Sequence, residues 1–278
     1  MKFAVDIPNF GEWADPRVVA EFAAGIEAAG WDGLSIWDHI LVMDGWNVGD
    51  PWIALAAAAA ATDRIRLFTG VTPIPRRAPW KLAREAVSLD HLSGGRFGLG
   101  VGLGWPTDPE FTRFDGPTDV RTRADMLDEG LEILEGLWSG EPFAYSGDHY
   151  TLRESTFMPT PLQEPRIPIW VAGMWPNRRP MRRAARYDGV MPIYLDDKGE
   201  FKAPHPDTVA EVAAYVTSHR ESDDPFDLTV AAMAYADDEF DIAAFAEAGA
   251  TWWLEQWHPG ATDHDAWLER VLAGPPKV

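Results

Sequence analysis

The sequence predicts a single (β/α)8 barrel, and three observations carry this prediction. Short apolar runs rich in β-forming residues alternate with longer amphipathic stretches along the whole chain. Eight such pairs fit within 278 residues, whereas an open doubly wound sheet usually has fewer strands. No repeat, low-complexity linker or boundary of a second domain interrupts the pattern, so residues 1–278 are expected to form one domain.

Each predicted strand is a short apolar run, and each is followed by sequence with helical spacing. In chain order the strands are residues 3–7, 33–37, 65–70, 96–102, 167–172, 189–194, 228–234 and 251–257. The helices that follow them are residues 16–29, 51–61, 79–92, 120–138, 180–187, 206–219, 240–248 and 264–272. Several helices have Pro in the first turn, where its missing N–H costs no hydrogen bond.

One stretch departs from the alternation. Residues 141–165, which include Tyr145, His149 and Tyr150, come between the fourth helix and the fifth strand. Their length and composition are typical of a hairpin or excursion, and a segment of this kind can lie over the barrel mouth.

Composition and charge exclude several classes of function. A formal charge of −20 disfavours a nucleic-acid groove or an anionic membrane surface, because either partner needs a basic face. The absence of Cys excludes disulfides, thiol catalysis and Cys-ligated metal centres, and no metal site is predicted. The first strand meets Asp6 too early for a signal-peptide core, and the Ala run at 54–61 is too short to span a bilayer. A cytoplasmic location is therefore expected.

In a barrel of this kind the residues just past the carboxyl end of each strand face the active site. Here those positions are rich in aromatic side chains and poor in carboxylates. They include Asp38 and His39 after the second strand, Thr69 to Thr72 at the third, Gly102 to Trp105 at the fourth, Gly173 to Trp175 at the fifth, Tyr194 and Tyr235 at the next two, and Glu255, Trp257 and His258 at the eighth. A wide apolar mouth suits a flat aromatic cofactor better than a metal held by charged ligands, although core packing explains any single Trp equally well.

A resemblance to the luciferase-like monooxygenase family appears in three segments. Residues 82–105 read LAREAVSLDHLSGGRFGLGVGLGW, in which a helix ends in a Ser-Gly-Gly-Arg turn and leads into a glycine-rich fourth strand. Trp37-Asp38-His39 follows the second strand, and residues 168–173, PIWVAG, form the fifth. The helix, turn and strand in register with eight units make the match far more specific than a lone Gly-x-Gly.

The resemblance implies an oxidoreductase that uses FMN or a deazaflavin of the coenzyme F420 type. It implies hydride or oxygen transfer to a small organic substrate, with a flavin reductase as a partner if FMN is used reduced, and a homodimer. The sequence leaves open which cofactor, which reaction and which substrate apply.

For the cofactor, the resemblance places Gly102, Gly104 and Trp105 beside the flavin ring, where a missing Cβ permits close approach. Both glycines are also explained as ordinary turn residues. The segment Thr69-Gly70-Val71-Thr72 resembles the family's bulge behind the ring, which often contains a non-prolyl cis peptide.

The phosphate needs a local device in a chain of this charge. Gly173, Met174 and Trp175 lead from a strand end into a helix, whose first N–H groups can face an anion. Arg178 and Arg179 can supply charge at the rim, and their alternative role is on a solvated helix face.

Three residues are candidates for the proton chemistry. Asp38 and His39 are adjacent acid and base groups at a strand end, and in the resembling family the His position contacts the flavin or its substrate. Their structural alternative is a helix cap beside a hydrogen-bonded His. Trp105 stands where some deazaflavin-dependent relatives carry an acid, so the proton donor is left between His39 and Glu110, which is otherwise a solvated residue at a helix start.

Two other functions compete with this interpretation. A metal-dependent barrel hydrolase or aldolase would use Asp38, His39, Glu255 and His258, although the chain has no His-x-His pair. A flavin-binding protein without turnover would use the same barrel and the same cofactor, because fold does not determine function.

Overall fold

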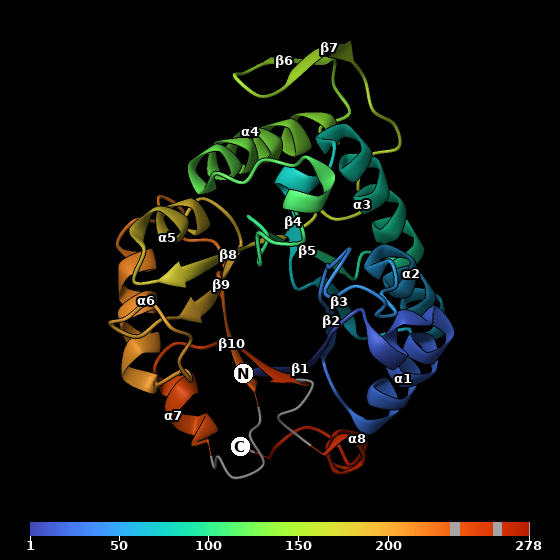
Figure 1. The fold of residues 1–278 in the computed structure, drawn as a ribbon, viewed down its shortest axis with the longest axis vertical. Helices are drawn as coiled ribbons and strands as arrows, with labels where there is room; N and C mark the ends of the chain where they lie inside the picture. Colours follow the sequence, from blue (N-terminus) through green and yellow to red (C-terminus); the bar gives the residue numbers. More distant parts are fainter. Residues whose placement is uncertain (234–239, 258–262, 278) are drawn as a thin grey trace.

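The barrel predicted from the sequence is present. The computed structural model describes residues 1–233, 240–257 and 263–277, so Tyr235, His258 and the last residue of the seventh predicted strand lie outside the described residues. Parallel strands form a closed barrel, and helices form a ring outside it (Figure 1). The eight barrel strands are β1 (Lys2–Ile7), β2 (Gly33–Ile36), β3 (Arg66–Thr69), β5 (Phe97–Gly102), β8 (Ile169–Trp175), β9 (Gly189–Tyr194), β10 (Asp227–Met233) and β11 (Trp252–Gln256).

The ring closes because the first and last strands pair. Asp6 on β1 is in register with Ser35 on β2 and with Gln256 on β11. On the opposite side β3 pairs with β5, and the short strand β4 (Thr72–Pro73) continues the line of β3 along β5. All of these pairs are parallel, so the carboxyl ends of the strands meet at one mouth.

The outer helices begin and end where the sequence provides caps. They are α1 (Pro16–Ala29), α2 (Pro51–Ala61), α3 (Pro79–Ser93), α4 (Val120–Trp138), α5 (Arg178–Ala184), α6 (Pro206–Thr217), α7 (Ile242–Glu247) and α8 (His264–Leu272). Asp50 accepts hydrogen bonds from the first N–H groups of α2, and Gly94 ends α3 with φ of 65°. Four helices match their predicted bounds, whereas α5 begins two residues earlier than predicted and ends three earlier. None of the described helices is long and apolar enough to cross a membrane.

The barrel interior has a bulky lower layer. Ala4, Phe68, Trp170, Trp252 and Leu254 form a buried cluster, and the Phe68 and Trp170 rings stack with centroids 4.2 Å apart. β5 leaves room for this cluster, because a Cβ on Gly98 would lie 2.7 Å from the Phe68 ring.

Toward the mouth, the residues that face inward become small. The Gly70–Val71 peptide bond is cis, in the segment that the sequence identified as a bulge. The bulge turns Val71 into the barrel, since a Cβ on Gly102 would lie 2.8 Å from Val71 Cγ2. A Cβ on Gly100 would lie 1.9 Å from the carbonyl oxygen of Thr69. Gly100 and Gly102 of β5 are therefore required by the protein's own bulge.

The excursion is a hairpin, but it does not lie over the mouth. Strands β6 (Phe143–Ser146) and β7 (Thr151–Ser155) pair antiparallel and lie outside α4 (Figure 1). The carboxylate of Glu129 on α4 accepts hydrogen bonds from the backbone N–H groups of Asp148, His149 and Tyr150. A connection from a helix to the next strand runs to the amino ends of the strands, which is the physical reason that a position over the mouth was wrong.

Candidate active site

Asp38 lies at the centre of a buried network just past β2. Its carboxylate accepts hydrogen bonds from Thr72 Oγ1 at 2.8 Å, from Arg77 Nη2 at 2.8 Å and from Arg76 Nη2 at 2.6 Å. It caps no helix, because Asp50 caps α2, so the structural alternative of a helix cap is wrong. Two guanidinium groups and one hydroxyl therefore hold this carboxylate in place.

Glu110 belongs to the same network, although it follows β5. The residue is buried, and Arg76 contacts Glu110 as well as Asp38. The backbone N–H groups of Ile40 and Leu41 donate to Glu110 Oε1 at 3.2 Å each. The alternative of a solvated residue at a helix start is therefore wrong, and Arg76 neutralises two carboxylates from two different loops.

His39 contacts this network through its ring. His39 Nδ1 lies 3.2 Å from Glu110 Oε1, and a carboxylate oxygen can only accept, so Nδ1 carries the proton and Nε2 keeps its lone pair. Asn9 fixes the backbone: its amide donates to the His39 carbonyl at 2.7 Å and accepts from the His39 N–H at 3.1 Å. Burial, and next the charge of Arg76, lower the pKa of His39 to about 4, so the imidazole is neutral at pH 7.

Aromatic rings surround the imidazole on its other sides. The ring centroids of Trp37 and His39 are 5.9 Å apart at 70°, and those of Phe10 and His39 are 6.1 Å apart. Phe10 also packs on Trp46, at 5.6 Å. The candidate base is thus held by a carboxylate on one side and by apolar rings on others.

The rim of the mouth is apolar. Large apolar side chains are exposed at the end of β9 and in the loops that follow β2, β5 and β9: Ile40, Met43, Trp46, Trp105, Ile193 and Phe201. Trp105 is 59% exposed, and its ring meets Phe201 edge-on with centroids 5.1 Å apart, which joins two of these loops. Large exposed apolar side chains that contact one another across two loops are typical of a binding site.

The residues predicted to hold a cofactor fall into two groups. Gly70, Val71 and Gly102 line the mouth, whereas the Thr69 hydroxyl donates to the Gly100 carbonyl inside the barrel wall. Gly104 has φ of 83°, and a Cβ there would lie 2.7 Å from the Phe111 ring. Glycine is therefore needed at position 104 by the loop itself, whatever ligand lies nearby.

The predicted phosphate segment is divided between the two faces of β8. Gly173 and Trp175 face outward: a Cβ on Gly173 would lie 2.4 Å from Pro180 of α5, and Trp175 is buried near Tyr215 of α6. Met174 lies between them and therefore points to the opposite face of the strand. The Arg178 guanidinium lies over the Trp175 ring at 4.0 Å.

The two predicted arginines differ in their partners. Arg179 pairs with Asp125 and, at 3.0 Å, with Asp128, both on α4. Arg178 lies over the rings of Trp175 and Tyr215, and no carboxylate of the described residues pairs with it. Arg178 is therefore the arginine whose charge is available to an anion.

A flavin fits the mouth on the chemistry that the structure shows. Ala172 and Ala231, which are partly exposed, together with Gly102 and Val71 leave a layer of small side chains above the bulky cluster. The apolar rim and this layer suit a flat, largely apolar ring, and His39 Nε2 adds one polar group.

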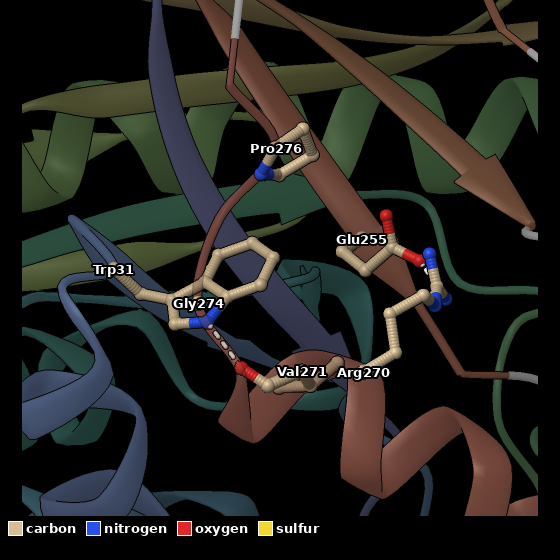
Figure 2. Close-up of a pocket in the computed structure, with 6 residues that line it drawn as sticks. All are labelled: Trp31, Glu255, Arg270, Val271, Gly274 and Pro276. Atoms are coloured by element: carbon tan, nitrogen blue, oxygen red, sulfur yellow. Dashed lines mark hydrogen bonds and ion pairs between the residues drawn. The ribbon is translucent and has the colours of Figure 1, made fainter.

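A separate cavity of about 230 Å³ lies outside the barrel, against α8 and the C-terminal segment. Figure 2 shows its lining, which includes Trp31, Glu255 and Arg270. Glu255 faces this cavity and pairs with Arg270, so it does not join Asp38 and His39. Within the described residues no group of three His, Asp or Glu side chains is placed to hold a metal, and His258 lies outside them.

The sequence reasoning missed Arg76 and Arg77, which hold the network together. Their signal was available: two adjacent arginines follow the third strand directly, in a chain with charge −20. It also noted Asp6 only as a residue that interrupts an apolar run.

Comparison with known proteins agrees with this architecture. The sequence profile of the luciferase-like monooxygenase family matches residues 1–269. The chain belongs to this family. It is 34% identical over 189 residues to the 4-hydroxyprotoasukamycin monooxygenase of Streptomyces nodosus subsp. asukaensis, which covers 67% of this chain and 48% of that protein. It is 34% identical over 153 residues to the oxygenase component of a flavin-dependent trigonelline monooxygenase of Acinetobacter baylyi, covering 54% and 41%. The chain thus matches about half the length, or less, of these curated relatives.

Solved structures of luciferase-like barrels share the fold. An F420-dependent secondary alcohol dehydrogenase in complex with an F420-acetone adduct has a TM-score of 0.77, at 19% identity, with 96% of each chain covered. The oxygenating constituent of 3,6-diketocamphane monooxygenase from Pseudomonas putida, in complex with FMN, has a TM-score of 0.75 at 17% identity, with 98% of this chain and 96% of that chain covered.

Proposed function

We propose that this chain is a flavin-dependent oxidoreductase that catalyses hydride or oxygen transfer on a small organic substrate at the C-terminal mouth of the barrel. One observation carries the proposal: His39 Nδ1 lies 3.2 Å from Glu110 Oε1 beneath an apolar rim. An oriented imidazole in a mouth of this kind is suited to move a proton while a planar cofactor provides the redox chemistry.

Each polar residue of the network has its own part. Glu110 accepts the Nδ1 proton and orients the ring, so that Nε2 can take a proton from a substrate hydroxyl or return one. Because burial keeps the imidazole neutral at pH 7, His39 starts as the base. Asp38 holds Arg76 in place, and Arg76 keeps the charge of Glu110 compensated when His39 becomes charged.

The cofactor in this proposal is FMN or a deazaflavin of the F420 type. When bound, it would accept or supply the hydride, or activate the oxygen, which the side chains cannot do. Gly70, Val71 and Thr72 of the bulge, Gly102 and Met174 would hold the ring, and Trp105 would cover it from the rim. Arg178 would bind the phosphate, since it has no carboxylate partner among the described residues.

Binding is tested by titrating the purified chain with FMN and with the deazaflavin, following the fluorescence of each. We expect saturable binding of at least one flavin at one site per chain. If a folded chain, checked by circular dichroism, binds neither flavin, the proposal is wrong. Isotopic oxygen in the product would identify monooxygenation, and transfer of deuterium from a labelled alcohol to the deazaflavin would identify dehydrogenation.

The competing functions give different results in the same experiments. A metal-dependent hydrolase would lose activity on treatment with a chelator and would contain a stoichiometric metal by elemental analysis. A flavin-binding protein without turnover would bind the ring but would show no hydride transfer and no oxygen incorporation with any alcohol or ketone offered.

The partners and the location of the protein remain proposals. The trigonelline relative is the oxygenase component of its enzyme, which supports a separate flavin reductase here if FMN is the cofactor. A homodimer is predicted, and light scattering on the purified protein measures it. A cytoplasmic location is predicted from the sequence alone.

A further inference from the structure

A second ionisable group lies below the mouth, and the proposed chemistry does not use it. Asp6, at the carboxyl end of β1, is only 3% exposed. Its Oδ2 accepts hydrogen bonds from Trp37 Nε1 at 2.7 Å and from Gln256 Nε2 at 2.6 Å. Trp37 directly follows β2 and Gln256 ends β11, and these two strands flank β1. Asp6 therefore links β1 to both of its neighbours, where the barrel closes.

The other oxygen of Asp6 has no completed hydrogen bond within the described residues. Asp6 Oδ1 lies beside Ser35 and under the bulge, where a Cβ on Gly70 would be 3.0 Å from Oδ1 and 2.3 Å from Ser35 Oγ. The Ser35 hydroxyl also completes no hydrogen bond with the described residues. A buried carboxyl oxygen and a buried hydroxyl thus face each other directly beneath the candidate cofactor surface.

The surroundings of Asp6 are neutral on every described side. Ser35 and Trp37 come from β2 and the residue after it, Gln256 from β11 and Gly70 from the bulge, and none of them ionises at ordinary pH. Burial raises the pKa of Asp6 to about 6, and the hydrogen bonds to its neighbours offset this only in part. Among the described residues no arginine contacts Asp6, in contrast to Asp38 and Glu110.

Trp37 connects Asp6 to His39. The indole N–H is held by Asp6, while the ring of Trp37 packs edge-on against the imidazole of His39 and against Phe10, with centroids 5.9 Å apart in both pairs. A shift of the indole would therefore change the packing of the imidazole. Packed side chains in a dense interior transmit small displacements in this way.

We propose that Asp6 is a positioning residue for His39, which it holds through the Trp37 indole, so that the protonation state of Asp6 changes the working position of the imidazole. The proposal rests on the proposed role of His39 as the proton-transferring group. Asn would fill the same volume as Asp6 without the free-energy cost of burying an unpaired carboxylate. A purely structural role therefore explains poorly why this position is an acid.

Glu255 provides a matched comparison on the next strand. It is also a buried carboxylate bonded to an indole, since Trp253 Nε1 donates to Glu255 Oε2 at 3.2 Å. It faces the cavity outside the barrel and pairs with Arg270 there (Figure 2). The same pair of groups is thus present on both faces of the barrel wall, and only the inner pair reaches His39.

The test follows the ring nitrogens of His39 by ¹⁵N NMR as a function of pH, in the chain without flavin. The His39 signals are identified by their loss in His39→Gln. In the wild type we expect them to shift with an inflection near pH 6, the pKa of Asp6. Asp6→Asn, which keeps an acceptor for the indole and cannot ionise, should remove that inflection. Trp37→Phe, which removes the indole N–H and keeps a ring, should remove it too.

Two further measurements are a control variant, Glu255→Gln, and the kcat of Asp6→Asn. Glu255→Gln should leave the inflection unchanged, and Asp6→Asn should lower kcat by about tenfold with flavin affinity retained. His39 signals that are the same in wild type and Asp6→Asn at every pH would overturn the proposal, as would an equal change in Glu255→Gln. If Asp6→Asn does not fold, Trp37→Phe gives the same decision. Full turnover in His39→Gln would refute the proposed function instead, because the NMR coupling does not depend on activity.

Discussion

Two sets of buried carboxylates lie at the same end of this barrel, and they differ in the charge of their neighbours. Asp38 and Glu110 share the guanidinium of Arg76, and Asp38 also contacts Arg77. In the part of the chain that the structure describes, only neutral donors contact Asp6. The guanidinium groups compensate the first two carboxylates, whereas at Asp6, which neutral groups face, burial raises the pKa to about 6.

His39 lies between these two regions and contacts both. The charge-paired region supplies the Glu110 oxygen at 3.2 Å, and the neutral region supplies the Trp37 ring. A fixed charge can hold a base in one orientation, whereas a neighbouring group that gains or loses a proton can change the position of the base with pH. Substitutions at Arg76 and at Asp6 should therefore have different effects on stability.

Removing Arg76 should have the largest effect on stability. Arg76→Met keeps much of the side-chain volume but leaves the charges of Glu110 and, in part, Asp38 buried without compensation. We expect the free energy of unfolding, measured with urea, to fall by about 3–5 kcal/mol. Arg113→Met is the control, because its ion pair with Asp44 is exposed and should be worth less than about 1 kcal/mol. Equal losses in the two variants would contradict the assignment of Arg76 as the organising charge.

Asp6 should reverse the usual dependence of stability on pH. Its pKa is raised from 3.8 to about 6 in the folded protein, so the folded state binds the proton more tightly than the unfolded state does. The stabilisation by the protonated form is present below about pH 4 and is lost as the pH rises through 6. Relative to Asp6→Asn, the wild type should lose about 2–3 kcal/mol between pH 4 and pH 7.5. A difference between the two proteins that stays constant with pH would show that Asp6 does not titrate in this range.

The two arginines of α5 should differ, because only one of them is already paired. Arg178→Ala should weaken the binding of phosphorylated flavin by about 1–3 kcal/mol and hardly affect riboflavin, which has the ring without the phosphate. Arg179→Ala should have a smaller effect, since Asp125 and Asp128 already engage that charge. Fluorescence titration with both ligands measures this. Equal losses for riboflavin and FMN would place the phosphate elsewhere.

The sequence predicted the barrel well because its elements depend on local periodicity. Each strand and helix buries one face, and this produces a periodic spacing of apolar residues along the local sequence, as in α4. The bounds of α5 were less accurate, because its seven residues contain too few apolar positions to define a period.

The site was predictable only in part, since its contacts join distant residues. Asp38 and His39 were found because strand ends meet at one mouth, and Glu110 because it follows Trp105 closely in the sequence. The bond between Asp6 and Gln256 joins residues 250 positions apart, and nothing in either neighbourhood indicates the partner. The end of β5 had the opposite difficulty: Gly102 and Gly104 looked like a cofactor surface, but packing against Val71 and Phe111 already requires glycine at both positions.

In the proposed reaction His39, oriented by Glu110, moves a proton at the C-terminal mouth of the barrel while a flavin is bound there. The most direct measurement is a single-turnover experiment in which flavin absorbance is followed after mixing the loaded enzyme with substrate, in the wild type and in His39→Gln. We expect the variant to bind flavin with unchanged affinity, to unfold at the same urea concentration and to react at least about tenfold more slowly. A folded, flavin-loaded His39→Gln variant that reacts at the wild-type rate would contradict it.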